Sequence, residues 1–205
     1  MGVYYNPDEP AIVPDGFLAI GVKRDTGERG RLSYVLWQEP SLPILALEVI
    51  SERYNKEYED KLEDYQSIEI LYYAIYNPFS GRRGRFKTRK RLEIYKLVGG
   101  KYELLNSENN WIWLPEIELG LGYEVGEYNG WQREWLYWFD RSSNRYLTAE
   151  ERAEREKLIS QQERLAKLHA ESIALQATQR ANEEYQEKER LAAYLRSIGV
   201  NPDDI

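Results

Sequence analysis

The sequence predicts an α/β (α+β) protein, with a mixed β-sheet around a crossover helix and a long helix at the C-terminal end. Short apolar runs rich in Ile, Val, Leu and Tyr, bounded by Gly and Pro, indicate strands. A helical segment between two of these runs gives a β-α-β unit. The final part contains no Pro or Gly between Thr148 and Gly199, which is typical of one long helix.

Five runs in the first part of the chain are the clearest strand candidates: residues 16–22, 43–51, 70–76, 91–98 and 101–105. Segment 52–68 has apolar side chains at helical spacing, so it predicts a crossover helix between the second and third runs. Gly99 and Gly100 separate the last two runs and predict a tight hairpin.

A change in composition at Thr148 divides the chain into an expected domain over residues 1–147 and a charged helical tail over residues 148–205. The pattern Thr148-x-x-Glu151 is a capping box, which marks the start of a helix. Four leucines follow a heptad spacing that polar residues interrupt: Leu158, Leu165, Leu168 and Leu175. Two interpretations stay open, a coiled coil that forms a homo-oligomer and a solvated helical tail.

Composition excludes several kinds of chemistry. The chain has no cysteine and a single histidine, His169, so disulfides, thiol nucleophiles and multi-histidine metal sites are not expected. Any catalysis would depend on carboxylates, lysine, hydroxyls or an oxygen-ligated metal. We expect a cytoplasmic protein with neither a signal peptide nor a membrane span.

One carboxylate lies in the middle of an apolar strand candidate. Glu48 is surrounded by Ile, Leu, Ala and Val in residues 43–51, where an unpaired charge would be costly. On a helical wheel, Lys61 falls at the centre of the apolar face of segment 52–68, which is unusual for a lysine. Glu48 and Lys61 could therefore form a structural ion pair, although Lys61 could also reach solvent past neighbouring tyrosines.

A second carboxylate, Asp15, follows Pro14 and directly precedes the strand candidate 16–22. If the strands at 16–22 and 43–51 are neighbours, Asp15 and Glu48 converge and Lys61 joins them. Two carboxylates and a lysine are a minimum set for metal-assisted hydrolysis of a phosphodiester. Mg²⁺, or Mn²⁺ in its place, would be held by the carboxylates, because these hard cations prefer oxygen ligands.

A basic segment lies between the strand candidates 70–76 and 91–98. Seven of the ten residues 82–91 are Lys or Arg, although the net charge of the chain is −7. The candidate DNA contacts in this segment are Arg82, Arg83, Arg85, Lys87, Arg89 and Lys90. Phe86 alone is insufficient for a base-stacking platform, and a solvated basic hairpin is the alternative interpretation.

Three stretches in succession carry a resemblance to a known family: VPDGFLAIGV, RLSYVLWQEPSLPILALEVIS and DKLEDYQSIEILYYAIYNP. Together they resemble the bacterial Uma-two family of proposed restriction endonucleases, within the PD-(D/E)xK nuclease superfamily. The resemblance implies a restriction-endonuclease-like fold and Mg²⁺-dependent hydrolysis of DNA. It also implies that Asp15 and Glu48 are the motif acids, and that Lys61 is a catalytic lysine displaced from the position of Ile50.

The resemblance also carries one departure. Family members usually have a further helix and strand before the segment that begins here at MGVYYNP, so we expect an N-terminally truncated domain. This departure keeps a second function open. The alternative to an endonuclease is a catalytically inactive nuclease fold that serves as an interaction or oligomerisation module.

Overall fold

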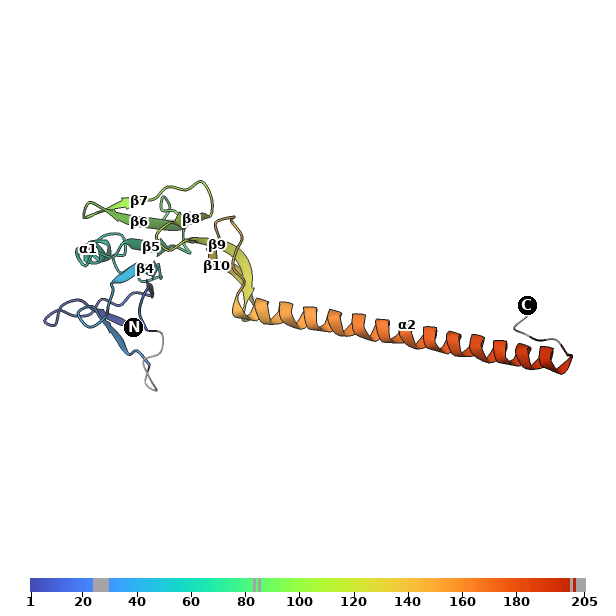
Figure 1. Ribbon diagram of the computed structural model, residues 1–205. Coiled ribbons are helices and arrows are strands. Elements are labelled where there is room, and N and C mark those ends of the chain that lie inside the picture. The colour runs from blue at the N-terminus through green and yellow to red at the C-terminus, as the bar shows by residue number, and fades with distance from the viewer. Residues whose placement is uncertain (24–29, 83, 85, 200, 202–205) are drawn as a thin grey trace. The chain divides into compact units, whose positions relative to one another are not determined.

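The computed structural model describes residues 1–23, 30–82, 84, 86–199 and 201 of the chain. Two compact units are present, Met1–Tyr146 and Leu147–Ile205. The described strands and the short helix α1 lie in the first unit, and the second contains the long helix α2 (Figure 1). In the described ranges, no helix combines the length and the apolar character that crossing a membrane requires.

The main sheet of the first unit has five strands in the order β2-β4-β5-β6-β7. Their bounds are Gly16–Ala19 (β2), Pro43–Val49 (β4), Tyr72–Tyr76 (β5), Leu92–Val98 (β6) and Lys101–Leu104 (β7). β4 and β5 are parallel, and the other neighbouring pairs are antiparallel. Gly99 and Gly100 both have positive φ, at 56° and 82°, as a two-residue hairpin requires. The predicted mixed α/β fold is confirmed.

The crossover helix is shorter than the sequence predicts. α1 spans Asp60–Ser67, whereas the prediction covered residues 52–68. Lys56 has a positive φ of 58°, which interrupts a right-handed helix. Other hydrogen bonds also hold this segment. The side chain of the buried Glu57 accepts a hydrogen bond from the backbone N–H of Asn55, and its backbone carbonyl accepts one from the Tyr73 hydroxyl. The structure therefore places Lys61 in the first turn of α1.

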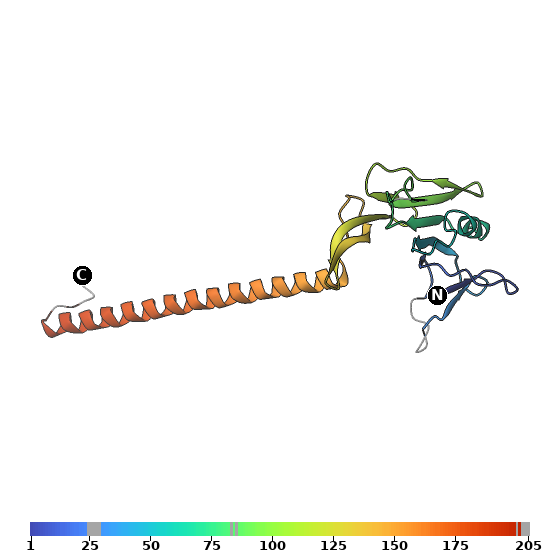
Figure 2. The same ribbon diagram turned by 180° about the vertical axis from the view of Figure 1, so that it is seen from behind.

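The two faces of the main sheet pack into different cores. The face covered by α1 has a buried cluster of six residues: Ala46, Ile50, Tyr65, Ile70, Tyr73 and Ile75. α1 lies beside β4 and β5 in both views of the ribbon (Figures 1 and 2). The opposite face includes Leu45, Tyr72 and Ile94, which pack with Leu114 and Leu121 of a second sheet. Strand alternation places Glu48 on the α1 face.

Two smaller sheets complete the first unit. β8 (Trp111–Leu114), β9 (Leu119–Tyr128) and β10 (Trp131–Phe139) form an antiparallel sheet in the order β10-β9-β8. β1 (Gly2–Tyr4) pairs in parallel with β3 (Ser33–Val35). The isolated bridge between Val3 and Ile12 brings the residues just before Asp15 back to β1.

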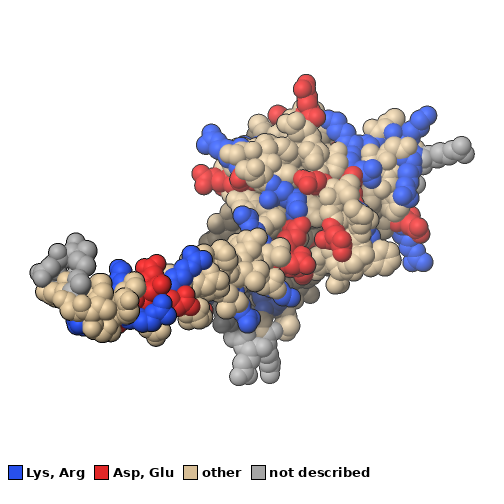
Figure 3. All heavy atoms as spheres, turned by 90° about the vertical axis from the view of Figure 1, so that its right-hand side faces the viewer, with Lys and Arg blue, Asp and Glu red and all other residues tan. Residues whose placement is uncertain are grey.

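The second unit consists chiefly of α2, which spans Ala149–Ser197. Thr148 and Glu151 form the predicted capping box, because each side chain accepts a hydrogen bond from the backbone N–H of the other residue. None of the described residues of α2 is buried, and acidic and basic side chains are interleaved along it (Figure 3). The four leucines with heptad spacing are all exposed within the single chain.

Candidate active site

Asp15, directly before β2, lies across from Glu48 of the neighbouring strand β4. β2 pairs with β4 so that Gly16 faces Leu47, which places Asp15, one residue earlier, opposite Glu48. Asp15 is exposed, and its Oδ2 accepts a hydrogen bond of 2.7 Å from the amide of Val49. Pro14 is buried and fixes the backbone just before Asp15. The convergence of the two acids that the sequence predicts follows from this register.

Glu48 is buried and engaged at both carboxylate oxygens. Only 1% of the residue is exposed. Its Oε2 lies 2.7 Å from Lys61 Nζ, and its Oε1 accepts a hydrogen bond of 2.7 Å from the Tyr65 hydroxyl. Lys61 and Tyr65 lie one turn apart on α1, so the helix presents both donors to the same strand. The expected ion pair between Glu48 and Lys61 is present.

The environment of Glu48 shifts its protonation. Burial raises the pKa of this carboxyl above its ordinary value, while the hydrogen bonds from Lys61 and Tyr65 oppose the rise and the nearby Asp15 charge adds to it. Burial and the Glu48 charge also raise the pKa of the Tyr65 phenol, so Tyr65 keeps its proton and donates. The cluster therefore combines a buried carboxyl group with one cationic donor, Lys61, and one neutral donor, Tyr65.

The donor atoms of this cluster suit a hard divalent cation. Mg²⁺ is commonly held by one or two carboxylates, with water and substrate phosphate completing its shell. Asp15 is exposed beside Glu48, and each carboxylate has more acceptor positions than the hydrogen bonds described above use. Among the described residues, no group of three His, Cys, Asp or Glu side chains could hold a metal ion. Any metal here would therefore rest on Asp15 and Glu48.

Lys61 connects the buried carboxylate with open space. Its side chain is 17% exposed, and it also lines a hollow of about 540 Å³ beside the N-terminal segment. The other wall residues are Tyr5, Glu9, Pro10, Ala11, Ile12, Val13, Asn55, Lys56, Asp60 and Asp64. The hollow carries charges of both signs, because Glu9, Asp60 and Asp64 line it together with the two lysines, and Lys61 joins it to Glu48.

The basic segment emerges at the same edge of the sheet as the two acids. β4 and β5 are parallel, with Val49 paired to Tyr76, so the loop after β5 leaves the sheet beside the end of β4. Arg82, Lys87 and Lys90 are exposed there. Arg89 is half-buried over the Tyr58 ring and 3.5 Å from Glu93. Arg83 and Arg85 lie outside the described residues.

Glu93 is a buried acid that the sequence analysis did not single out. It is 4% exposed and pairs across the sheet with Ile75, which in turn pairs with Glu48. The Tyr95 hydroxyl and the Lys90 amide donate to Glu93, in addition to its ion pair with Arg89. Its position inside the apolar run RLEIYKLV is the same signal that identified Glu48. Glu93 anchors the base of the basic loop.

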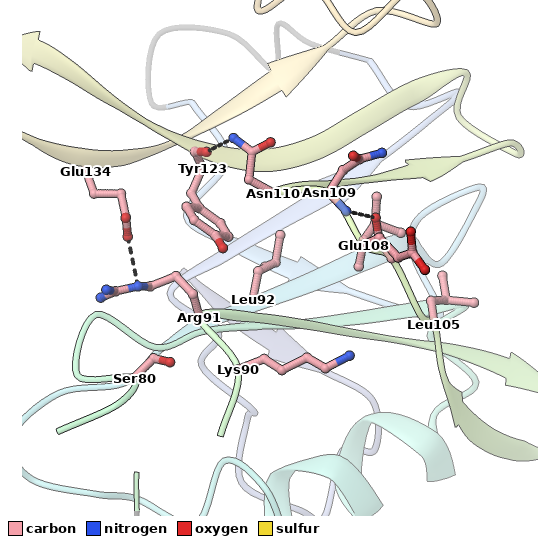
Figure 4. A pocket seen from close by; sticks show the side chains of 12 residues that line it. Ser80, Lys90, Arg91, Leu92, Leu105, Glu108, Asn109, Asn110, Tyr123 and Glu134 are labelled. Carbon is pink, nitrogen blue, oxygen red and sulfur yellow. Dashed lines mark hydrogen bonds and ion pairs between the residues drawn. The ribbon is translucent and has the colours of Figure 1, made fainter. Parts of the chain in front are cut away.

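A separate cavity of about 460 Å³ lies between β6, the loop before β8, and strands β9 and β10 (Figure 4). Arg91 in its wall forms an ion pair of 3.0 Å with Glu134, and the Asn110 amide donates to the Tyr123 carbonyl. Asp15, Glu48 and Lys61 are not among its lining residues. The predicted acids and lysine therefore form a site apart from this cavity.

A mixed sheet with one acid directly before β2, a second acid on the adjacent strand β4 and a lysine from the crossover helix is consistent with a restriction-endonuclease-like core. Residues 1–126 match the model of the Uma2 family, which is described as "Putative restriction endonuclease". Because this match covers more than half of the 205 residues, the chain belongs to the Uma2 family. Neither a curated protein nor a solved structure matches the chain.

Proposed function

We propose that the protein is a metal-dependent endonuclease that hydrolyses phosphodiester bonds of DNA, with Mg²⁺ or Mn²⁺ as cofactor. The observation that carries the proposal is the meeting of Asp15, Glu48 and Lys61 at one edge of the sheet. Membership of a family described as restriction endonucleases supports it, as does the basic loop at the same edge.

Each residue has a distinct role in this proposal. Asp15 and Glu48 would hold the metal, which when bound polarises the phosphate and lowers the pKa of a water molecule. Lys61 would place its positive charge beside the phosphate and stabilise the charge that develops there. Tyr65 fixes the orientation of Glu48 through its hydrogen bond. Arg82, Lys87 and Lys90 would contact the DNA backbone. Arg89 of the same loop forms an ion pair with Glu93.

The direct test is cleavage of supercoiled plasmid by the full chain with Mg²⁺ and with a chelator. Asp15→Asn is the most informative variant, because an amide oxygen still accepts the hydrogen bond from the Val49 amide while the charge is lost. We expect Asp15→Asn and Lys61→Ala to slow cleavage about a hundredfold or more, the effect of losing one electrostatic contribution at an active site.

The controls for this test are matched to the two substitutions. Asp8→Asn and Lys101→Ala change an exposed acid and an exposed lysine outside the cluster, and both should cleave as the wild type does. Lys61→Ala removes the partner of a buried acid and could destabilise the fold. Its thermal unfolding curve is therefore recorded to establish that the variant is folded at the assay temperature. Cleavage that persists in the chelator or in Asp15→Asn would rule out the proposed site.

A second function is favoured by the exposed leucines of α2. We propose that α2 mediates self-association of the protein through the seam of Leu158, Leu165, Leu168 and Leu175, whose exposed fractions range from 53% to 67%. Pairing of such helices would bury these side chains. This role is compatible with the endonuclease and would also serve an inactive nuclease fold.

A further inference from the structure

An aromatic cavity lies beside the basic loop, apart from the cluster of acids. It measures about 260 Å³ and is lined by Tyr54, Tyr58, Glu59, Phe86 and Arg89. Two segments that are far apart in the sequence form this cavity. Tyr54 and Tyr58 precede α1, whereas Phe86 and Arg89 belong to the loop between β5 and β6. The structure thus adds two tyrosines to Phe86, which by itself would be too small a stacking surface.

The rings in this cavity are held in place by their packing. The Phe86 ring meets the Tyr54 ring edge-on at 6.1 Å between centroids and stacks on Phe79 at 6.1 Å. Tyr58 stacks on Tyr54 at 6.2 Å, and the Arg89 guanidinium lies 4.0 Å from the centre of the Tyr58 ring. Four of the five lining residues are half-buried, namely Tyr54, Tyr58, Phe86 and Arg89. Rings and a guanidinium plane at a solvent-facing cavity are the groups on which nucleobases stack.

Charge separates the interior of the cavity from its surroundings. Arg82, Lys87 and Lys90 are exposed on the same loop and attract a phosphate backbone. Glu59 also lines the cavity and accepts a hydrogen bond from the Tyr54 hydroxyl, so its acid offsets the Arg89 guanidinium and the lining has no excess of positive charge. A ligand with a neutral planar part and an anionic part would place the first inside and the second on the loop. A nucleotide unit of a strand has this distribution of charge.

The position of the cavity relates it to the proposed site. Tyr54 lines the aromatic cavity, while Asn55, Lys56 and Lys61 line the hollow beside the N-terminal segment, and Lys61 also contacts Glu48. One short segment of chain thus forms a wall of both. A strand held at the aromatic cavity would pass close to Lys61.

We propose that this cavity binds an unpaired nucleobase of a single DNA strand, which stacks on the Phe86 ring with its edge toward the Tyr54 ring, in the cavity that Arg89 also lines. The base must be unpaired, because both faces of a base within a duplex are covered by its neighbours. The inference rests on the proposed function for its choice of DNA, and it names the substrate class of that site as DNA with unpaired bases.

The test is binding of the full chain to a labelled oligodeoxythymidine, measured by fluorescence anisotropy in a chelator so that no cleavage occurs. A strand of the same length that carries abasic sites in place of its bases, and a duplex, are measured in parallel. We expect Phe86→Leu and Tyr54→Leu to weaken binding to the single strand about fivefold or more, the effect of losing one stacking contact. Tyr54→Phe keeps the ring and should weaken binding less than Tyr54→Leu does.

Further comparisons separate stacking from charge and from misfolding. Tyr128→Leu alters a tyrosine that is 44% exposed on β9 and should leave binding unchanged. The wild type should bind the abasic strand and the duplex more weakly than oligodeoxythymidine. This comparison uses the wild-type protein alone, so it does not depend on whether a variant folds. Phe86→Leu should keep the wild-type salt dependence, since phosphate contacts set that slope.

Each of three results would overturn the inference. The first two are equal affinity of the wild type for the abasic strand and oligodeoxythymidine, and wild-type affinity of Phe86→Leu for oligodeoxythymidine. Equal affinity for the duplex would also overturn it. These outcomes are distinct from failure of the endonuclease proposal. If the protein cleaves plasmid but Phe86→Leu binds the single strand as tightly as the wild type, the endonuclease proposal stands and the cavity proposal fails. If the protein does not cleave plasmid but Phe86→Leu weakens binding, only the cavity proposal stands.

Discussion

At the scale of single residues, Glu48 shows what a sequence can predict. Its place within an apolar strand predicted that the carboxylate is protonated, paired with a cation or bound to a metal, and the structure has Lys61 Nζ at 2.7 Å. The same signal at Glu93 would have predicted a second buried acid. The second donor to Glu48, the Tyr65 hydroxyl, could not be separated from an ordinary core tyrosine, because its role depends on the orientation of α1.

The hydrogen bond from Tyr65 should contribute to stability. Tyr65→Phe removes the hydroxyl while keeping the ring, so Oε1 of the buried Glu48 loses the hydrogen bond from Tyr65. We expect the free energy of unfolding to fall by about 1–3 kcal/mol, the range for a buried polar group left without its partner. Urea denaturation measures this change. Tyr102→Phe, which removes a hydroxyl donor to the Ile70 carbonyl, gives a comparison with an uncharged acceptor.

Glu48 should also make stability depend on pH in a defined direction. Its pKa in the folded protein lies above the ordinary value of 4.5, so the folded state holds this proton to higher pH than the unfolded state does. Stability from this group is therefore full below pH 4.5 and is lost as pH rises through the folded pKa.

Glu48→Gln isolates this contribution, because the amide does not titrate. We expect the stability of the wild type relative to Glu48→Gln to decline as pH rises from 4.5 and to level off above the folded pKa. Urea denaturation at a series of pH values measures it, with Glu103→Gln, an exposed glutamate of β7, as the control for losing one charge. A relative stability that rises over this window would mean that Lys61 outweighs burial.

At the scale of elements, the strands were easier to predict than the crossover helix. Apolar runs located the five strands of the main sheet to within a few residues, and the β4-β5 crossover followed from the helical segment between them. The predicted start of the helix was wrong, because residues 52–59 have helical spacing but are held by the contacts of Glu57 and Tyr73. Such contacts connect segments far apart in the sequence and leave no local signal.

α2 offers a test of self-association. A double variant, Leu165→Glu with Leu168→Glu, places charges in the heptad seam, and we expect it to convert an oligomer of the full chain to a monomer. Ile173→Glu lies off the seam at a similar exposure, 54%, and should leave the oligomer intact. Sedimentation velocity measures the mass of each protein. A wild-type chain that sediments as a monomer would remove the proposed role of α2.

At the scale of the whole molecule, function depends on an arrangement that no single motif contains. The parallel pairing of β4 and β5 brings together the end of the strand that carries Glu48 and the loop that carries the basic residues. The chain as a whole has a net charge of −7, so the proposed attraction to DNA would depend on that local surface. The sequence predicted each of these parts, but the aromatic cavity required the tertiary packing of Phe86 against Tyr54.

The central claim is that Asp15 and Glu48 share one divalent cation. Calorimetric titration of the full chain with Mn²⁺ tests it most directly, because it needs neither DNA nor turnover. We predict binding at one site that is lost in Asp15→Asn and retained in Asp8→Asn. A wild-type protein that takes up no ion, or an Asp15→Asn variant that binds it equally well, would show that Glu48 and Lys61 form an ion pair of structural importance only.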